Sequence, residues 1–149
     1  MASVPRLVYL DANALIYAVE NTTSPVRHLL IRSVSAGLSF VTSELTISEV
    51  LVKPFQHQDR RLAGAFDALL SGRSPIDVRT ITRAILRESA SIRAAQGAKL
   101  ADAIHAATAL DAGCRTIVTN DLRFPKLPSM SYVLPDRVMT LLGGGGAMP

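Results

Sequence analysis

The sequence predicts an α/β fold of three layers, in which helices cover both faces of a central, mainly parallel sheet of four to five strands. Short strand-like runs alternate with longer helical segments along the chain, which is typical of such sheets. The length of 149 residues fits one domain. Apolar residues make up 48% of the chain and charged residues only 19%, so we expect a packed globular core and no long disordered region.

The first elements are a buried strand and two helices. Arg6–Leu10 is a short apolar run that stops at the polar Asp11, as a buried strand does. Asn13–Glu20 carries its large apolar side chains at helical spacing. After a polar break, Pro25 suits the first turn of a second helix that we expect to run to about Gly37.

The middle of the chain repeats this order. Leu38–Thr42 reads as the second strand, and Ser43 is a good N-cap for a helix over Glu44–Val52. We expect that helix to end before Pro54, because proline disrupts helix interiors. A further helix is predicted from about Gln58 to Leu70.

The second half contains three more short strands and two helices. Glycines that follow the helices are plausible C-caps. The predicted elements are a strand at Asp77–Thr80, helices at Thr80–Ala95 and Leu100–Ala112, and strands at Arg115–Thr119 and Ser131–Leu134. We place one domain at residues 1–142 and a flexible glycine-rich tail at residues 143–149.

Composition excludes several classes of protein. A single cysteine, Cys114, rules out an intrachain disulfide framework and a cysteine-cluster zinc site. The chain shows neither a long apolar span nor a signal peptide, so we expect a cytoplasmic protein. The apolar content of 48% is high for a small domain and favours a homodimer or a protein partner.

Two acidic residues occupy the positions where ligands bind in parallel sheets, beyond the carboxyl ends of the strands. Asp11 directly follows the first strand, and Asp121 follows the strand that ends at Thr119. Taken alone, each residue also fits a simple cap or turn, because aspartate and asparagine favour turns. Their common place at one sheet edge is what makes them candidates.

Two further acids lie on helices. Glu49 sits among apolar neighbours, where an unpaired carboxylate would be costly. Glu44, five residues earlier, points about 140° away and fits a first-turn acid. Asp102 lies at the start of its helix, and taken alone it also fits an acid in the first turn that is stabilised by the helix dipole. His105 lies three residues later on roughly the same face, and it reads either as a packed histidine or as part of the site.

Together, these acids predict a metal site. Four clustered carboxylates repel one another, and divalent cations relieve that repulsion. Hard oxygen ligands without cysteine or histidine clusters suit Mg²⁺ or Mn²⁺, and such ions promote phosphodiester hydrolysis. The predicted catalytic and metal-binding residues are Asp11, Glu49, Asp102 and Asp121.

Four stretches of the chain resemble the PIN-domain ribonucleases and, within them, the VapC-type toxins of bacterial toxin–antitoxin pairs. The stretches are VYLDANALIY (Val8–Tyr17), SELTISEVL (Ser43–Leu51), KLADAIHAATAL (Lys99–Leu110) and TIVTNDLRF (Thr116–Phe124). The resemblance implies metal-dependent RNA cleavage, inhibition by a cognate antitoxin, and metal binding by the same four acids. It also implies polar support from Asn13 and Thr119, which we expect to orient the ligands.

The functional hypothesis is therefore an endoribonuclease in which metal-activated water cleaves RNA and leaves a 5′-phosphate. Arg123 and Lys126 are candidates for phosphate contacts, whereas Arg79, Arg83 and Arg87 are more simply a solvated helix face. Apart from the four candidate ligands, eight acidic residues stand against 16 basic ones, which suits a polyanionic substrate.

Two alternatives remain open at this point. One is a PIN-type nuclease that processes RNA without an antitoxin. The other is a non-catalytic module that uses the acidic pocket to bind metal, as phospho-acceptor signalling domains do, or that binds RNA without cleaving it. The three lysines, Lys53, Lys99 and Lys126, do not obviously occupy the strand-end position that such signalling domains need.

Overall fold

A computed structural model of the chain describes residues 6–33, 35–73 and 75–143. In this part of the chain five strands form one sheet in the order β3-β2-β1-β4-β5, and every neighbouring pair is parallel. The strands are β1 (Arg6–Leu10), β2 (Leu38–Ser43), β3 (Ile76–Arg79), β4 (Thr116–Val118) and β5 (Ser131–Val133). The predicted parallel sheet is confirmed, with each strand within two residues of its expected bounds.

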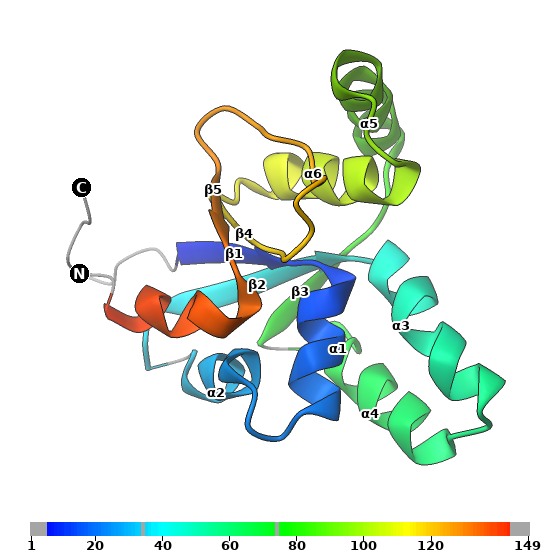
Figure 1. Cartoon of the computed structure of the whole chain (residues 1–149), viewed down its shortest axis with the longest axis vertical. Helices are drawn as coiled ribbons and strands as arrows, with labels where there is room; N and C mark the ends of the chain where they lie inside the picture. Colours follow the sequence, from blue (N-terminus) through cyan, green and yellow to red (C-terminus); the bar gives the residue numbers. More distant parts are fainter. Residues whose placement is uncertain (1–5, 34, 74, 144–149) are drawn as a thin grey trace.

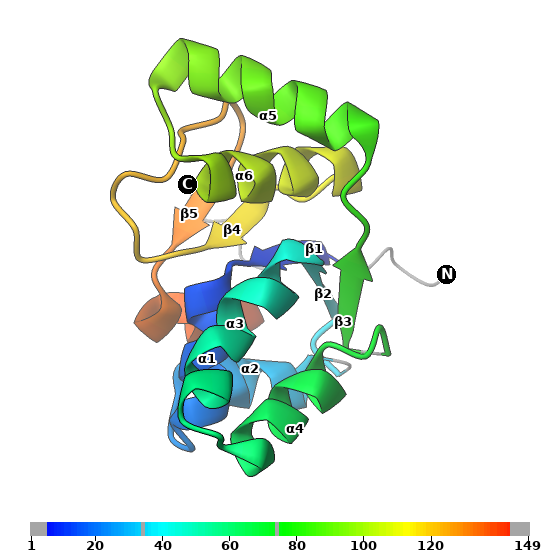
Figure 2. The same cartoon turned by 90° about the vertical axis from the view of Figure 1, so that its right-hand side faces the viewer.

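Helices cover both faces of the sheet, as expected for three layers (Figures 1 and 2). One layer holds α1 (Ala12–Glu20), α2 (Pro25–Arg32), α3 (Leu45–Gln56), α4 (Arg60–Leu69) and the 3-10 helix η1 (Pro135–Gly143). The other layer holds α5 (Arg83–Gln96) and α6 (Leu100–Ala112). Figure 2 shows α6 between the sheet and α5, so α6 is the helix that contacts the strands on this side.

The core is divided by the sheet into two halves. Successive side chains of a strand point to opposite faces, so Val8 and Leu10 of β1 join the half under α1, α2 and α4. Tyr9, between them, joins the half under α5 and α6. The first half is built of large aliphatic residues, whereas α6 contributes mainly alanines to the second.

Three helix boundaries differ from the expectations by three residues or more. The α2 helix ends at Arg32 and not near Gly37, because the Ser33 hydroxyl donates to the Leu30 carbonyl and closes the last turn. The α5 helix starts three residues later than predicted, because the hydroxyl of Thr82 accepts the Ile85 N–H and forms the N-cap.

The third difference is Pro54, which lies inside α3 and does not end it. Its ring removes one helical hydrogen bond. The side chain is buried, however, and the helix continues to Gln56, where the His57 N–H bonds to the Lys53 carbonyl. Tertiary packing therefore overrides the local preference.

Near the end of the chain, η1 was not predicted, although its Val138 is fully buried. Of the tail expected at residues 143–149, residues 144–149 lie outside the described residues. Within the described residues, no helix has both the length and the hydropathy needed to cross a membrane.

The strand order reverses at β1. The chain builds outward from β1 through β2 to β3, and then returns to place β4 on the opposite side of β1. The ends of β1 and β4 are neighbours, since Leu10 pairs with Val118. This is the reversal point at which parallel sheets bind ligands.

Candidate metal centre at the sheet edge

Asp11 occupies the turn between β1 and α1. One carboxylate oxygen, Oδ1, accepts the Ala14 N–H at 2.9 Å, so the side chain is the N-cap of α1. The residue is only 6% exposed. Burial raises the pKa of Asp11 above its usual value and the charge of Glu49 adds to the increase, while hydrogen bonds from Thr119 and Ala14 oppose it.

The end of β4 supplies Thr119 and Asp121. The Thr119 side chain is buried, and its hydroxyl oxygen accepts the Asp121 N–H at 3.1 Å. The Thr119 side chain also acts on Asp11, where its hydrogen-bonding effect holds the pKa of Asp11 down. Thr119 therefore connects the turn after β1 to the turn after β4. Asp121 itself is half-buried.

Asp102 lies in the first turn of α6 and is half-buried. Burial is the main effect that raises its pKa, and the next is the negative charge of Asp121. The charges of Asp11 and Glu49 raise the pKa of Asp102 further. The charges of the three other candidate acids thus all raise the pKa of Asp102, so the four carboxylates share one electrostatic neighbourhood.

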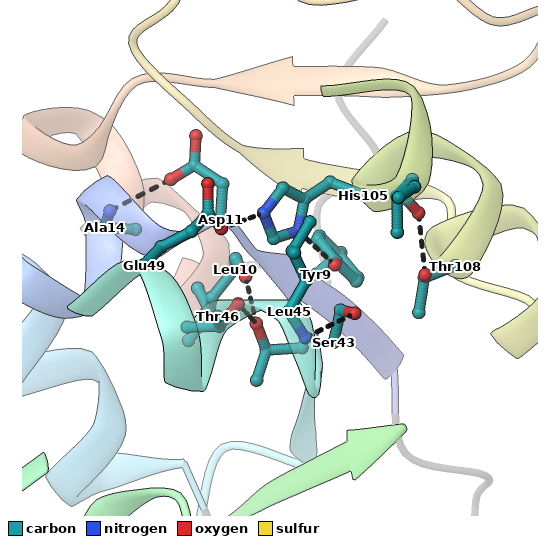
Figure 3. Close-up of polar contacts among 12 residues, drawn as sticks. Tyr9, Leu10, Asp11, Ala14, Ser43, Leu45, Thr46, Glu49, His105 and Thr108 are labelled. Atoms are coloured by element: carbon teal, nitrogen blue, oxygen red, sulfur yellow. Dashed lines mark hydrogen bonds and ion pairs between the residues drawn. The ribbon is translucent and has the colours of Figure 1, made fainter. Parts of the chain in front are cut away.

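Glu49 reaches this neighbourhood from α3. Its Oε1 lies 2.6 Å from Nε2 of His105 on α6, and the residue is half-buried. Figure 3 shows the Glu49 carboxylate beside Asp11, with the imidazole of His105 on its other side. Glu44, the residue directly before α3, is exposed.

The His105 ring is part of a buried polar chain. Its Nδ1 lies 2.6 Å from the hydroxyl of Tyr9, whose side chain is fully buried under α6. Burial raises the pKa of Tyr9 well above its usual value, so the phenol keeps its proton. His105 is therefore a buried residue that hydrogen-bonds to both Tyr9 and the candidate ligand Glu49.

Tyr9 is a polar residue of this region that was not predicted from the sequence. Its signal was a tyrosine inside an otherwise aliphatic strand, because a buried tyrosine hydroxyl usually finds a polar partner. The sequence alone does not identify that partner.

The other predicted residues lie around the acids. Asn13 is exposed on α1, in contrast to the buried Thr119. Arg123 is exposed, and its Nε lies 3.7 Å from Oδ1 of Asp121. Lys126 is also exposed and places its Nζ 4.3 Å from the centre of the Tyr132 ring. Arg79 pairs with Asp77 at 2.9 Å on β3.

The donor set fits a hard divalent cation. All four candidates are carboxylates, and the raised pKa values of Asp11 and Asp102 reflect burial and mutual repulsion, which a cation relieves. Within residues 6–33, 35–73 and 75–143, no three or more histidine, cysteine, aspartate or glutamate side chains are grouped so that they could hold a metal ion as they stand.

Comparison with known proteins places this geometry in a family. The family model of the PIN domain matches residues 8–129, which is most of the chain and includes all four acids. Comparison with curated protein sequences gives no match.

Solved structures show the same fold. VapBC2 of Rickettsia felis, bound to a fragment of its promoter DNA, is 16% identical and superposes with a TM-score of 0.69 over 85% of this chain and 96% of that one. A toxin–antitoxin complex from Klebsiella pneumoniae is 23% identical, with a TM-score of 0.64 over 86% and 97%.

A third similar structure is that of an RNA-cleaving toxin. VapC20 of Mycobacterium tuberculosis, a toxin that cleaves the sarcin-ricin loop, is 17% identical, with a TM-score of 0.58 over 78% of this chain and 92% of that one. At these identities the likeness concerns the fold. Together with the match over residues 8–129, it establishes that the chain belongs to the PIN domain family.

Proposed function

We propose that this protein is an endoribonuclease that hydrolyses RNA phosphodiester bonds with the help of Mg²⁺ or Mn²⁺. The observations that carry the proposal are that Asp121, Asp11 and Glu49 each raise the pKa of Asp102, and that Asp11 and Asp121 follow the neighbouring parallel strands β1 and β4. Membership of the PIN domain family supports the same activity.

The chain's own residues have distinct tasks in this proposal. The four carboxylates would bind the cation. Thr119 would help to orient Asp121, whose N–H bonds to its hydroxyl, and Asp11, whose pKa it lowers. Arg123 and Lys126, exposed beside Asp121, attract the RNA backbone without reading its sequence. When bound, Mg²⁺ or Mn²⁺ supplies an activated water and stabilises negative charge on the phosphate.

The biological role that we propose is that of the toxin in a toxin–antitoxin pair. Two of the similar structures are complexes of a toxin with its antitoxin, and a third is an RNA-cleaving toxin. We infer an antitoxin protein as the partner of this chain, RNA as its substrate, a homodimer as its assembly and the cytoplasm as its location.

The direct test is cleavage of structured RNA by single variants. Asp102→Asn and Glu49→Gln should each reduce cleavage in Mg²⁺ or Mn²⁺ by about a hundredfold or more, because each removes one ligand charge. Glu44→Gln is the matched control, since it makes the same change at the exposed residue directly before α3. An excess of chelator should abolish cleavage by the wild type.

Full activity of both Asp102→Asn and Glu49→Gln would overturn the metal mechanism. Binding of Mn²⁺ without cleavage of any RNA would favour the non-catalytic module instead. The toxin role has its own test, which is growth arrest on expression and its reversal by the product of a small neighbouring reading frame. Cleavage without growth arrest would favour RNA processing.

A further inference from the structure

Two buried polar side chains lie behind Glu49, in the half of the core that α6 covers. Tyr9 is 0% exposed and His105 is 2% exposed. The Tyr9 hydroxyl lies 2.6 Å from Nδ1 of His105, and Nε2 of His105 lies 2.6 Å from Oε1 of Glu49. Figure 3 shows the three side chains in a row that leads from β1 through α6 to α3. Such a buried chain is costly unless every polar atom is bonded.

A neutral imidazole satisfies both of these contacts with one tautomer. The Nε2–H donates to the ionised carboxylate of Glu49, and Nδ1 accepts the hydroxyl proton of Tyr9. Both ring nitrogens are then engaged by protein atoms. His105 is accordingly unavailable as a metal ligand in this arrangement, and its Nε2 is bonded to Glu49 instead.

Glu49 needs such a support more than the other acids do. Asp11 is held by Ala14 and Thr119, and Asp121 is tied to Thr119 through its own N–H. Glu49 has a longer side chain, lies in the middle of α3 and is half-buried, so its carboxylate has more rotational freedom to lose. The contact with His105 removes that freedom and occupies Oε1.

We propose that Tyr9 and His105 are positioning residues that hold Glu49 as a one-oxygen ligand, with Oε1 bound by the imidazole and Oε2 presented to the cation. The inference rests on the proposed function in one respect, namely that Glu49 is a metal ligand. It adds a mode of binding for Glu49 and a role for two residues that carry no metal themselves. Outer partners of this kind set ligand orientation and cation affinity.

The test is calorimetric titration of the full chain with Mn²⁺, which reads out binding without catalysis. His105→Leu keeps a side chain of similar size but removes the donor, and it should lower Mn²⁺ affinity about 10- to 100-fold. His105→Gln restores an N–H donor near the position of Nε2, and its affinity should stay within about threefold of the wild type. Equal affinities for the Leu and Gln variants would overturn the proposal.

Tyr9→Phe tests the far end of the chain while removing a single oxygen atom. It should lower Mn²⁺ affinity by about three- to tenfold in the wild-type background, because the imidazole loses its orienting bond. In the His105→Gln background the same change should have no effect on affinity, since Tyr9 acts through His105. An equal loss in both backgrounds would contradict a relay through the ring. If His105→Leu does not fold, the effect of Tyr9→Phe in the wild-type and His105→Gln backgrounds tests the positioning role instead.

Glu49→Gln separates this inference from the proposed function. If Glu49→Gln binds Mn²⁺ as the wild type does, Glu49 is not a metal ligand. The proposed ligand role of Glu49 and the positioning role of Tyr9 and His105 are then both wrong. If Glu49→Gln weakens binding while a folded His105→Leu binds normally, only the positioning role fails. Melting temperatures of all variants without metal identify any loss of affinity that comes from unfolding.

Discussion

Asp11 and Asp59 make the same local structure in two different regions of the molecule. Asp11 caps α1 through the Ala14 N–H at 2.9 Å, and Asp59 caps α4 through the Leu62 N–H at 3.0 Å. The first is buried at the sheet edge, whereas the second is exposed. Next to Asp11, the charge of Glu49 adds to the effect of burial and raises the pKa of Asp11.

The comparison separates capping from function. A cap stabilises its helix by satisfying one backbone N–H, and an exposed carboxylate does so without a desolvation cost. At Asp11 the same bond is made at a buried place next to a second negative charge, which is unfavourable for folding alone. This unfavourable burial of the Asp11 carboxylate indicates that its charge has a role other than capping α1.

The largest expected difference is in activity. Asp11→Asn and Asp59→Asn both keep a good cap, because asparagine caps helices as well as aspartate does. Asp11→Asn should nevertheless lower RNA cleavage in Mn²⁺ by about a hundredfold or more, whereas Asp59→Asn should leave the rate unchanged. Initial rates on one RNA substrate check this. Similar cleavage rates for the two variants would show that Asp11 is no more important for activity than Asp59.

The second difference concerns stabilisation by metal. At a Mn²⁺ concentration about 100 times Kd, the wild type and Asp59→Asn should gain about 2.7 kcal/mol, or about 5–10 °C in Tm. Asp11→Asn should gain much less, because it lacks one ligand charge. Thermal melts with Mn²⁺ and with chelator measure this, and a full gain in Asp11→Asn would exclude Asp11 from the site.

A smaller difference should appear on removal of the caps. Asp59→Ala should destabilise the metal-free protein by about 1 kcal/mol, the usual cost of a lost N-cap. Asp11→Ala should cost less than Asp59→Ala, since the loss of the cap is offset by removal of a buried charge beside Glu49. Urea unfolding of both variants in chelator gives the comparison. A greater cost at Asp11 would indicate that the cap outweighs the repulsion.

The smallest expected effect is the pH dependence of metal-free stability. The folded pKa of Asp11 is raised above its usual value of 3.8, so folding favours the protonated form. The stabilisation from Asp11 is therefore complete below about pH 3.8 and is lost as pH rises through the raised folded value. Asp11→Asn should be slightly more stable than the wild type at pH 7, with a gap that closes toward pH 4.

Melting curves from pH 4 to pH 7 in chelator measure this gap. A gap that widens toward low pH would give the opposite sign and would mean that the pKa of Asp11 is lowered on folding.

Much of the fold was predictable because its signals are local. The bounds of α6, Leu100–Ala112, agree with the prediction, and the helix ends at Gly113 with φ of 81°, a conformation that suits glycine. The exceptions depend on contacts beyond the local pattern. Pro54 remains inside α3 because it is buried, and η1 forms where Val138 enters the core.

The candidate site was predictable to the extent that strand ends define it. Asp11 and Asp121 follow directly from the rule that parallel strands share a carboxyl edge. The support of Glu49 was not predictable, because Tyr9 and His105 are 96 residues apart in sequence and Glu49 is 56 residues from His105. No periodicity of the sequence relates such distant side chains.

Local patterns specify the alternation of strands and helices, the capping residues and the acids at the strand ends, because hydrophobic periodicity and turn chemistry act over a few residues. The difference between Asp11 and Asp59, and the contacts that join Glu49 to His105 and His105 to Tyr9, arise only in the folded molecule. Burial and the interaction of charges depend on distances between segments that are far apart in the chain, and folding is what brings those segments together.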